Sequence, residues 1–214
     1  MITIHGRETS SNVQAVMWTL AELELMHERL DVGGPFGGND SAQFLAMNPM
    51  GLVPVLQEGE LTLSESQAII RYLGTKPNGA SLWPRECEKR AVVDQWMEWA
   101  KVNVYPIFIY KVFWQLIRVG AKQRNHDLIA EGAGELKHLM QIADARLSKH
   151  KWLAGDHFSL ADISFGSNLY RYYELDFDRA DTPALDAYYK RLCTRPAYQA
   201  HIMISFESMR VSDD

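Results

Sequence analysis

The sequence predicts a small α/β domain followed by an all-helical domain, and three observations support this fold class. Over roughly the first 75 residues, short β-rich runs alternate with apolar stretches of helical spacing. The segment TKPNGASLWP then gathers turn-forming residues. Beyond it strand signals almost vanish, while apolar residues keep recurring at helical spacing. We therefore expect an α/β domain over residues 1–77 and a helical domain over residues 86–214.

The N-terminal part is typical of a βαβ unit followed by a ββα unit. We expect strands at residues 2–5, 29–32, 53–57 and 61–63, and helices over residues 10–25 and 64–74. Ser10, Ser11 and Asn12 are all able to cap the first helix. Ser64 and Gln67 have the spacing of a capping box at the second helix.

The C-terminal part shows only helical patterns. Helices are expected over residues 86–118, 128–150, 159–175 and 182–193. Pro106 should kink or interrupt the first of them, because proline lacks the N–H group that a helix interior needs. Ser159 and Asp162 have S-x-x-D spacing ahead of an apolar run, which indicates a capping box rather than a catalytic pair.

Composition excludes several classes of function. The chain has 214 residues, of which 47% are hydrophobic and 23% charged, as in ordinary globular proteins. A net charge of −5 with scattered basic residues disfavours nucleic-acid and anionic-membrane partners. Cys87 and Cys193 form no CxxC motif, and the seven histidines show no metal-binding spacing, so we expect free thiols and no metal. The N-terminus lacks the features of a signal peptide and no apolar run reaches the ~18 residues of a membrane span, so we expect a cytoplasmic protein.

Pro54 is out of place in the apolar run NPMGLVPVL, which otherwise looks like a buried strand. A proline cannot donate a hydrogen bond to a strand ladder. Either the strand begins beside Pro54, or the backbone at this point has another use.

Several motifs together resemble those of the cytosolic glutathione S-transferase family, in its serine-type, bacterial-like form, close to the phi and theta classes. The motifs are SSNVQAV at 10–16, NPMGLVPVL at 48–56, SESQAI at 64–69 and LAGDHFSLADI at 153–163. The resemblance covers nearly the whole chain. It implies a thioredoxin-like N-terminal domain, an all-helical C-terminal domain, glutathione as co-substrate and a homodimer with a role in detoxification.

The resemblance also assigns the glutathione site. It implies that Pro54 follows a cis peptide bond and that the backbone of Val53 pairs with the cysteinyl backbone of glutathione, as a short extra strand would. The alternative is a trans proline that merely starts a strand. The resemblance further implies that Glu65 and Ser66 hold the γ-glutamyl end of glutathione.

The chemistry that such a site requires is modest. A free thiol with a pKa near 8.5 is only about 3% ionised at pH 7, and lowering that pKa by about two units takes roughly 2.7 kcal/mol. One hydroxyl at a helix N-terminus can supply this. By the family pattern Ser10 is the donor to the sulfur; Ser11 is the alternative, and Asn12 could act as a second donor.

One position departs from the family pattern. Where serine-type relatives place basic residues to hold the glycyl carboxylate, this chain has Asn39 and Asp40, and Asp40 would repel a carboxylate. The glycyl end is therefore held by Asn39 and backbone alone, by a more distant cation, or only poorly.

A second substrate is expected against the helical domain, where aromatic side chains recur. The candidates for a pocket that binds a hydrophobic electrophile are Trp99, Asn103, Tyr105, Ile107, Tyr110 and Trp114, with Lys101, Lys111 and Tyr170 nearby. The leading hypothesis is a glutathione transferase. Thiol–disulfide exchange is disfavoured because no cysteine occupies position 10 or 11, and a non-catalytic interaction protein on the same fold is the alternative.

Overall fold

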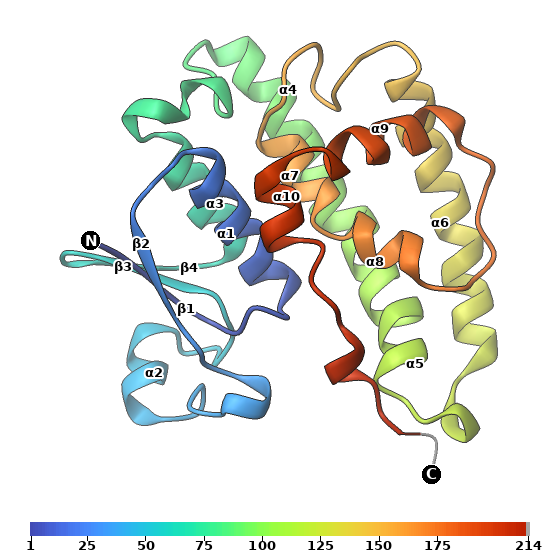
Figure 1. Ribbon diagram of the computed structural model, residues 1–214, viewed down its shortest axis with the longest axis horizontal. Helices are drawn as coiled ribbons and strands as arrows, with labels where there is room; N and C mark the ends of the chain where they lie inside the picture. The colour runs from blue at the N-terminus through green and yellow to red at the C-terminus, as the bar shows by residue number, and fades with distance from the viewer. Residues whose placement is uncertain (213–214) are drawn as a thin grey trace.

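A computed structural model describes residues 1–212 and shows an α/β part and a helical part side by side (Figure 1). The α/β part is built on a mixed sheet with strand order β2-β1-β3-β4. Its strands are β1 Ile2–His5, β2 His27–Leu30, β3 Val55–Glu58 and β4 Leu61–Ser64. β1 runs parallel to β2 and antiparallel to β3, and β4 returns antiparallel to β3. The order of these elements confirms the thioredoxin-like fold that the sequence predicted.

Two helices of the α/β part lie between the sheet and the helical part (Figure 1). They are α1 Ser11–Glu22 and α3 Ser66–Gly74. Trp18 of α1 is fully buried, and its ring lies 4.8 Å from that of Tyr198 in the helical part. Packing on both sides therefore fixes the position of α1 and of its N-terminus.

The connection between β2 and β3 contains structure that the sequence patterns did not indicate. The short helix η1 covers Gly34–Phe36 and α2 covers Ala42–Met47. Ser41 caps α2, since its side chain accepts a hydrogen bond of 3.2 Å from the backbone of Phe44. α2 has only one buried residue, so it offered no apolar stripe to detect.

After α3, the helices of the described chain are joined by loops, and Trp152 and Gly155 form one isolated β-bridge. In order, these helices are η2 Pro77–Ser81, α4 Cys87–Glu98, η3 Trp99–Val104, η4 Ile107–Phe113, α5 Trp114–Ile117, η5 Ala121–Gln123, α6 His126–Leu147, α7 Leu160–Gly166, α8 Leu169–Glu174, α9 Pro183–Cys193, α10 Pro196–His201 and η6 Glu207–Met209. The predicted helix over residues 159–175 is thus two helices, α7 and α8.

Pro106 does not end the long helix that starts at Cys87. The segments η3 and η4 on either side of it are π-helical, and Pro106 itself keeps helical angles of φ −65° and ψ −41°. A wider helical turn tolerates a residue without an N–H group better than an α-turn does. An interruption at Pro106 is therefore wrong, because the chain stays helical with an altered hydrogen-bonding pattern; the alternative, a kink, stays a prediction.

The two expected capping boxes have opposite outcomes. At α7 the box is present, and the carboxylate of Asp162 accepts a hydrogen bond of 2.8 Å from the backbone of Ser159. At α3 the expected box of Ser64 and Gln67 is wrong, because the N-cap residue is Glu65, which has a φ of +67°. The backbone conformation required at Glu65 shifts the helix start by one residue.

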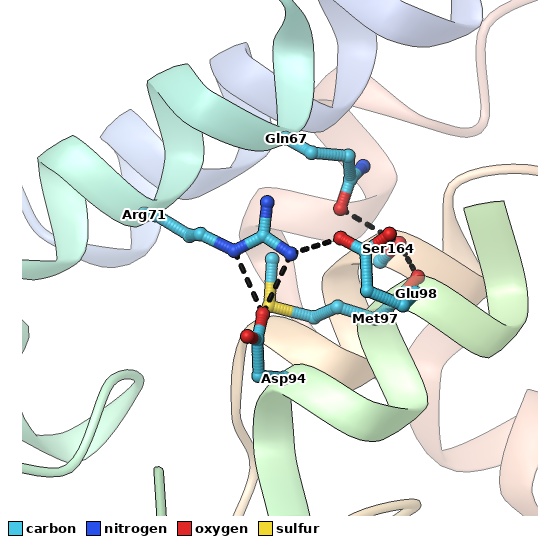
Figure 2. Close-up of polar contacts among 6 residues, drawn as sticks. All are labelled: Gln67, Arg71, Asp94, Met97, Glu98 and Ser164. Atoms are coloured by element: carbon cyan, nitrogen blue, oxygen red, sulfur yellow. Dashed lines mark hydrogen bonds and ion pairs between the residues drawn. The ribbon is translucent and has the colours of Figure 1, made fainter. Parts of the chain in front are cut away.

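Side chains of α3 instead connect the two parts of the molecule (Figure 2). Arg71 forms ion pairs with Asp94, at 2.6 Å, and with Glu98, both on α4. Gln67 accepts a hydrogen bond of 3.1 Å from Ser164 of α7. These polar contacts fix α3 against the helical part beside the buried apolar residues.

Candidate functional site

The N-terminus of α1 begins directly after the loop that leaves β1. Ser10 is its N-cap residue and is only 9% exposed. Among the described residues, its side chain makes no capping hydrogen bond to the helix. The hydroxyl is therefore available at a point where unpaired backbone N–H groups favour an anion.

Ser11 and Asn12 have partners of their own. Burial raises the pKa of Tyr105, and hydrogen bonding of the phenol to Ser11 partly opposes that rise. The Oδ1 atom of Asn12 accepts hydrogen bonds from Lys101 Nζ, at 2.7 Å, and from Ser66 Oγ, at 3.3 Å. Of the three residues predicted at the helix start, Ser10 is the one whose side chain is least engaged.

Val53 and Pro54 lie at the edge of the same region. The Val53–Pro54 peptide bond is cis, as the sequence resemblance implied. β3 begins at Val55, and within residues 1–212 the backbone of Val53 makes no hydrogen bond to other backbone groups. Its N–H and C=O groups are therefore available to an extended ligand.

Glu65 and Ser66 stand on the other side of Asn12. Ser66 is 3% exposed and donates to Asn12, while Glu65 is exposed at the start of α3. Burial lowers the pKa of Lys101 to about 8, and the charges of Glu65 and Glu98 act in the opposite direction. Lys101 thus links the helical part to the starts of both α1 and α3.

A cavity of about 230 Å³ opens at Ser10 between the two parts of the molecule. Its lining residues are Arg7, Thr9, Ser10, Ser11, Asn12, Gly33, Gly34, Asn39, Gly51, Leu52, Val53, Tyr105, Ile109, Tyr110, Phe113, Trp114, Arg118, Arg171 and Met209. Residues from the α/β part form one wall and aromatic residues of η4 and α5 form much of the other. None of these described lining residues is acidic.

Three arginines in this lining were not predicted from the sequence. Arg7 packs against the glycine loop, where a Cβ atom at Gly34 would lie 2.8 Å from its Cδ. Arg118 lies over the ring of Trp114, with its guanidinium carbon 5.6 Å from the ring centroid. Burial and the charge of Arg118 both lower the pKa of Arg7.

Arg171 is the most buried of the three, at 3% exposed. Its Nη2 atom donates to the backbone oxygen of Thr9, at 2.8 Å, and to Gln14, at 3.1 Å. Burial lowers its pKa to about 10, so the guanidinium is still charged at neutral pH. It lies directly beside the segment that carries Ser10, and it adds positive charge there.

The predicted second-substrate residues divide into two groups. Tyr105, Tyr110 and Trp114 line the cavity, with edge-to-face ring contacts of 6.4 Å and 4.8 Å between successive members. Trp99 and Ile107 instead pack against the core, and Asn103 is exposed. These three residues are absent from the cavity lining.

The other sequence candidates also separate. Asn39 lines the cavity and donates to the backbone of Gly51 at 2.8 Å, whereas Asp40 is exposed outside the lining. Lys111 pairs with Glu131 at 2.7 Å on the surface, and Tyr170 packs against Phe206. Neither Lys111 nor Tyr170 belongs to the cavity lining.

Neither a metal site nor a membrane-spanning helix occurs among the described residues. No group of three or more His, Cys, Asp and Glu side chains within residues 1–212 could hold a metal ion. In the same part of the chain, no helix has both the length and the apolar character needed to cross a membrane.

Comparisons with known proteins agree with this geometry. Residues 4–81 match the family model of the glutathione S-transferase N-terminal domain, and residues 94–196 match that of the C-terminal domain. Glutathione S-transferase GstB of Escherichia coli is 37% identical over 206 residues, which cover 95% of this chain and 99% of GstB. Glutathione S-transferase 4 of Zea mays is 30% identical over 92% of this chain and 89% of its own.

A solved structure gives the same result. The theta class glutathione S-transferase of Xanthomonas axonopodis pv. citri, crystallised with glutathione bound, superposes with a TM-score of 0.91 and is 39% identical. The match covers 95% of this chain and 98% of that chain. With both family models, full-length relatives and a shared fold in agreement, the chain belongs to the glutathione S-transferase family of enzymes.

Proposed function

We propose that this protein is a glutathione transferase in which the Ser10 hydroxyl stabilises the thiolate of glutathione for attack on an electrophile. The proposal rests on Ser10 at the start of α1. Its hydroxyl makes no capping hydrogen bond among the described residues, and Ser10 lines the cavity. Relatives are named glutathione S-transferases, and one similar structure contains bound glutathione.

The surrounding groups fit a tripeptide in one orientation. The backbone of Val53 can pair with the cysteinyl unit, which brings the sulfur toward Ser10. The γ-glutamyl end then extends toward Glu65 and Ser66 at the start of α3. The glycyl carboxylate extends toward Asn39 and Arg7, so Arg7 takes the place of the basic residues missing at positions 39 and 40.

The energy available is sufficient for thiolate formation. A hydrogen bond to a charged acceptor contributes about 1.5 to 3 kcal/mol, and a helix N-terminus about 0.3 to 2 kcal/mol. The charge of Arg171, bound to the backbone of Thr9, adds to this stabilisation. Together these groups can lower the thiol pKa by the roughly two units that make most of the bound thiol reactive at pH 7.

The aromatic wall is the proposed site for the second substrate. Tyr105, Tyr110 and Trp114 face the cavity from the helical part, where an apolar electrophile would displace water from the rings. The thiolate sulfur forms a bond to a carbon that faces these rings, while the bond from that carbon to a leaving group breaks and the leaving group departs with the bonding pair. Asn12, held by Lys101 and Ser66, can orient the groups around Ser10.

The family membership also suggests an oligomeric state and a cellular role. We infer a homodimer in which the α/β domain, residues 1–77, packs on the helical domain, residues 86–214, of a second copy. We likewise propose a role in detoxification in the cytoplasm. Analytical ultracentrifugation of the purified chain tests the dimer, and a single monomeric species would refute it.

The central proposal is tested by titrating the thiol of bound glutathione through its thiolate ultraviolet band. In the wild type we expect the pKa of that thiol to lie about two units below the free value. Ser10→Ala should raise it by about one to two units, which is the loss of one charge-assisted hydrogen bond.

Ser11→Ala is the matched control, because it removes the adjacent hydroxyl from the same helix turn. A larger rise in the thiol pKa for Ser11→Ala than for Ser10→Ala would assign the role to Ser11. Saturable glutathione binding without any thiolate signal would indicate a non-catalytic binding protein on this fold.

A further inference from the structure

Three arginines give the cavity a positively charged lining. Arg7, Arg118 and Arg171 all line it, and none of the described lining residues is acidic. Arg118 also lowers the pKa values of both other guanidiniums through charge repulsion, although burial is the main cause in each. Carboxylates that usually neutralise such clusters are therefore missing from the lining, and the cluster favours an anion.

The three arginines are not equivalent. Arg171 is held by Thr9 and Gln14 beneath the start of α1. Arg7 lies at the glycine loop beside Asn39, where the glycyl carboxylate is proposed to bind. Arg118 is exposed at the end of α5, on the aromatic wall, and among residues 1–212 its guanidinium contacts the ring of Trp114. In the orientation proposed above, the ends of the tripeptide are assigned to other residues, and Arg118 has no assigned role.

Buried polar atoms in the same region also lack partners. Within residues 1–212, neither Arg171 Nε nor Gln14 Nε2 has a hydrogen-bond partner, although both atoms are buried. Buried donors normally find partners, and an unpaired guanidinium nitrogen is costly. These two atoms therefore add unpaired donors, and no acceptor, to the region around Arg171 beside the cavity.

We propose that the second substrate is an aromatic or apolar electrophile that carries a carboxylate, and that Arg118 binds this carboxylate while the ring lies against Tyr110 and Trp114. The proposal rests on the proposed function and narrows its substrate class. A guanidinium recognises a carboxylate through two parallel hydrogen bonds, which a neutral amide cannot reproduce. Arg118 is thus a specificity-determining residue.

The reaction of such a substrate balances without an additional reagent. For a benzylic chloride, the thiolate sulfur donates an electron pair to the benzylic carbon as the carbon–chlorine bond breaks. Chloride leaves with the bonding pair, and the thiol proton has already passed to solvent. The carboxylate remains unchanged and serves only for recognition.

The test uses one matched pair of probes for binding and another for turnover. For binding to the glutathione-loaded protein, 4-methylbenzoate and 4-methylbenzamide are compared by calorimetry. For turnover, kcat/KM is compared for 4-(chloromethyl)benzoate and 4-(chloromethyl)benzamide. In the wild type we expect a preference of about tenfold or more for the anion in both assays, as a charge-assisted pair predicts.

The Arg118→Gln variant should reduce that preference about tenfold, to near unity, in both assays. Lys122→Gln is the control, because Lys122 lies on η5, four positions further along the chain, and is absent from the cavity lining. It removes one cation from the same segment and should keep the preference. A wild type with no preference, or an Arg118→Gln variant that retains it, would overturn the proposal.

Two further outcomes separate this proposal from the proposed function. If Arg118→Gln weakens glutathione binding and leaves the anion preference intact, Arg118 belongs to the glutathione site and the inference is wrong. If no thiolate forms and neither chloride reacts, the transferase proposal fails. Anion-selective binding of 4-methylbenzoate that depends on Arg118 would still confirm the anion site in that case.

Discussion

The N-termini of α1 and α7 make an instructive comparison, because both helices begin after a serine. At α7, Ser159 and Asp162 form a capping box, and the Asp162 carboxylate accepts hydrogen bonds from Leu153 N, Ser159 N, Ser159 Oγ and Tyr188 OH at 2.8 to 3.2 Å. At α1, the Ser10 side chain makes no capping bond within the described chain. The two sites differ in which groups satisfy the helix end.

The two helix starts differ in whether the protein itself caps them. At α7 the protein itself satisfies the polar groups, so the helix start contributes to the folded state. At α1 the donors and cations face a cavity, and in the proposed function it is glutathione that completes their hydrogen bonds. A helix start that lacks its own cap is one that a substrate can use.

Asp162→Ala should have the largest effect on stability. It leaves the buried donors of Leu153, Ser159 and Tyr188 without an acceptor, and we expect the free energy of unfolding to fall by about 3 to 5 kcal/mol. Burial raises the pKa of Asp162 to about 6 although these donors oppose the rise. Urea denaturation monitored by circular dichroism measures the change. A loss of less than about 1 kcal/mol would show that the capping box is not a major source of stability.

Lys101 donates a hydrogen bond to Asn12 at the start of α1. Its replacement should give a pH-dependent change in the free energy of unfolding, of intermediate size. The pKa of Lys101 falls from 10.5 to about 8 on folding, chiefly through burial. Above pH 8 the unfolded chain therefore binds more protons at Lys101 than the folded chain, and the contribution of Lys101 to stability rises with pH. The difference in unfolding free energy between wild type and Lys101→Met should increase by about 1 to 2 kcal/mol from pH 7.5 to 9.5.

Lys111 provides the control for this titration. Hydrogen bonds to Glu131 and Glu135 raise its pKa, so its stabilising contribution is lost only as the pH rises beyond 10.5. Lys111→Met should therefore show no such increase over the same pH range. A flat difference for Lys101→Met as well would mean that Lys101 is charged in the folded protein throughout.

Local sequence patterns predicted much of the fold and the starts of both helices. The order of strands and helices, the capping box at Ser159 and the cis bond before Pro54 could all be inferred from the sequence or its resemblance to the family. They could be predicted because each depends on residues close together in the chain. The helix start with Ser10, Ser11 and Asn12 was predicted for the same reason.

The cationic cavity could not be predicted, because its arginines come from three separate segments. Arg7 follows β1, Arg118 ends α5 and Arg171 belongs to α8, so only tertiary packing brings them together. Their positions beside predicted residues were the available signal: Arg7 precedes Ser10 by three residues in the loop before α1, and Arg171 adjoins Tyr170. Likewise, the division of the aromatics between cavity and core depends on the π-helical turns around Pro106, which periodicity does not reveal.

The smallest predicted effect sharpens the comparison most directly, because it uses the same substitution at both helix starts. Ser159→Ala removes a buried hydroxyl from a complete capping box, and the unfolding free energy should fall by about 1 kcal/mol. Ser10→Ala removes a hydroxyl with no capping bond among residues 1–212, so the loss without ligand should be only about a few tenths of a kcal/mol. Saturating glutathione should then stabilise the wild type more than Ser10→Ala, since the stabilisation at a given glutathione concentration grows with the logarithm of the binding affinity. Equal losses at the two serines, with equal stabilisation by glutathione, would mean that Ser10 is an ordinary cap and that the contrast between α1 and α7 has no functional basis.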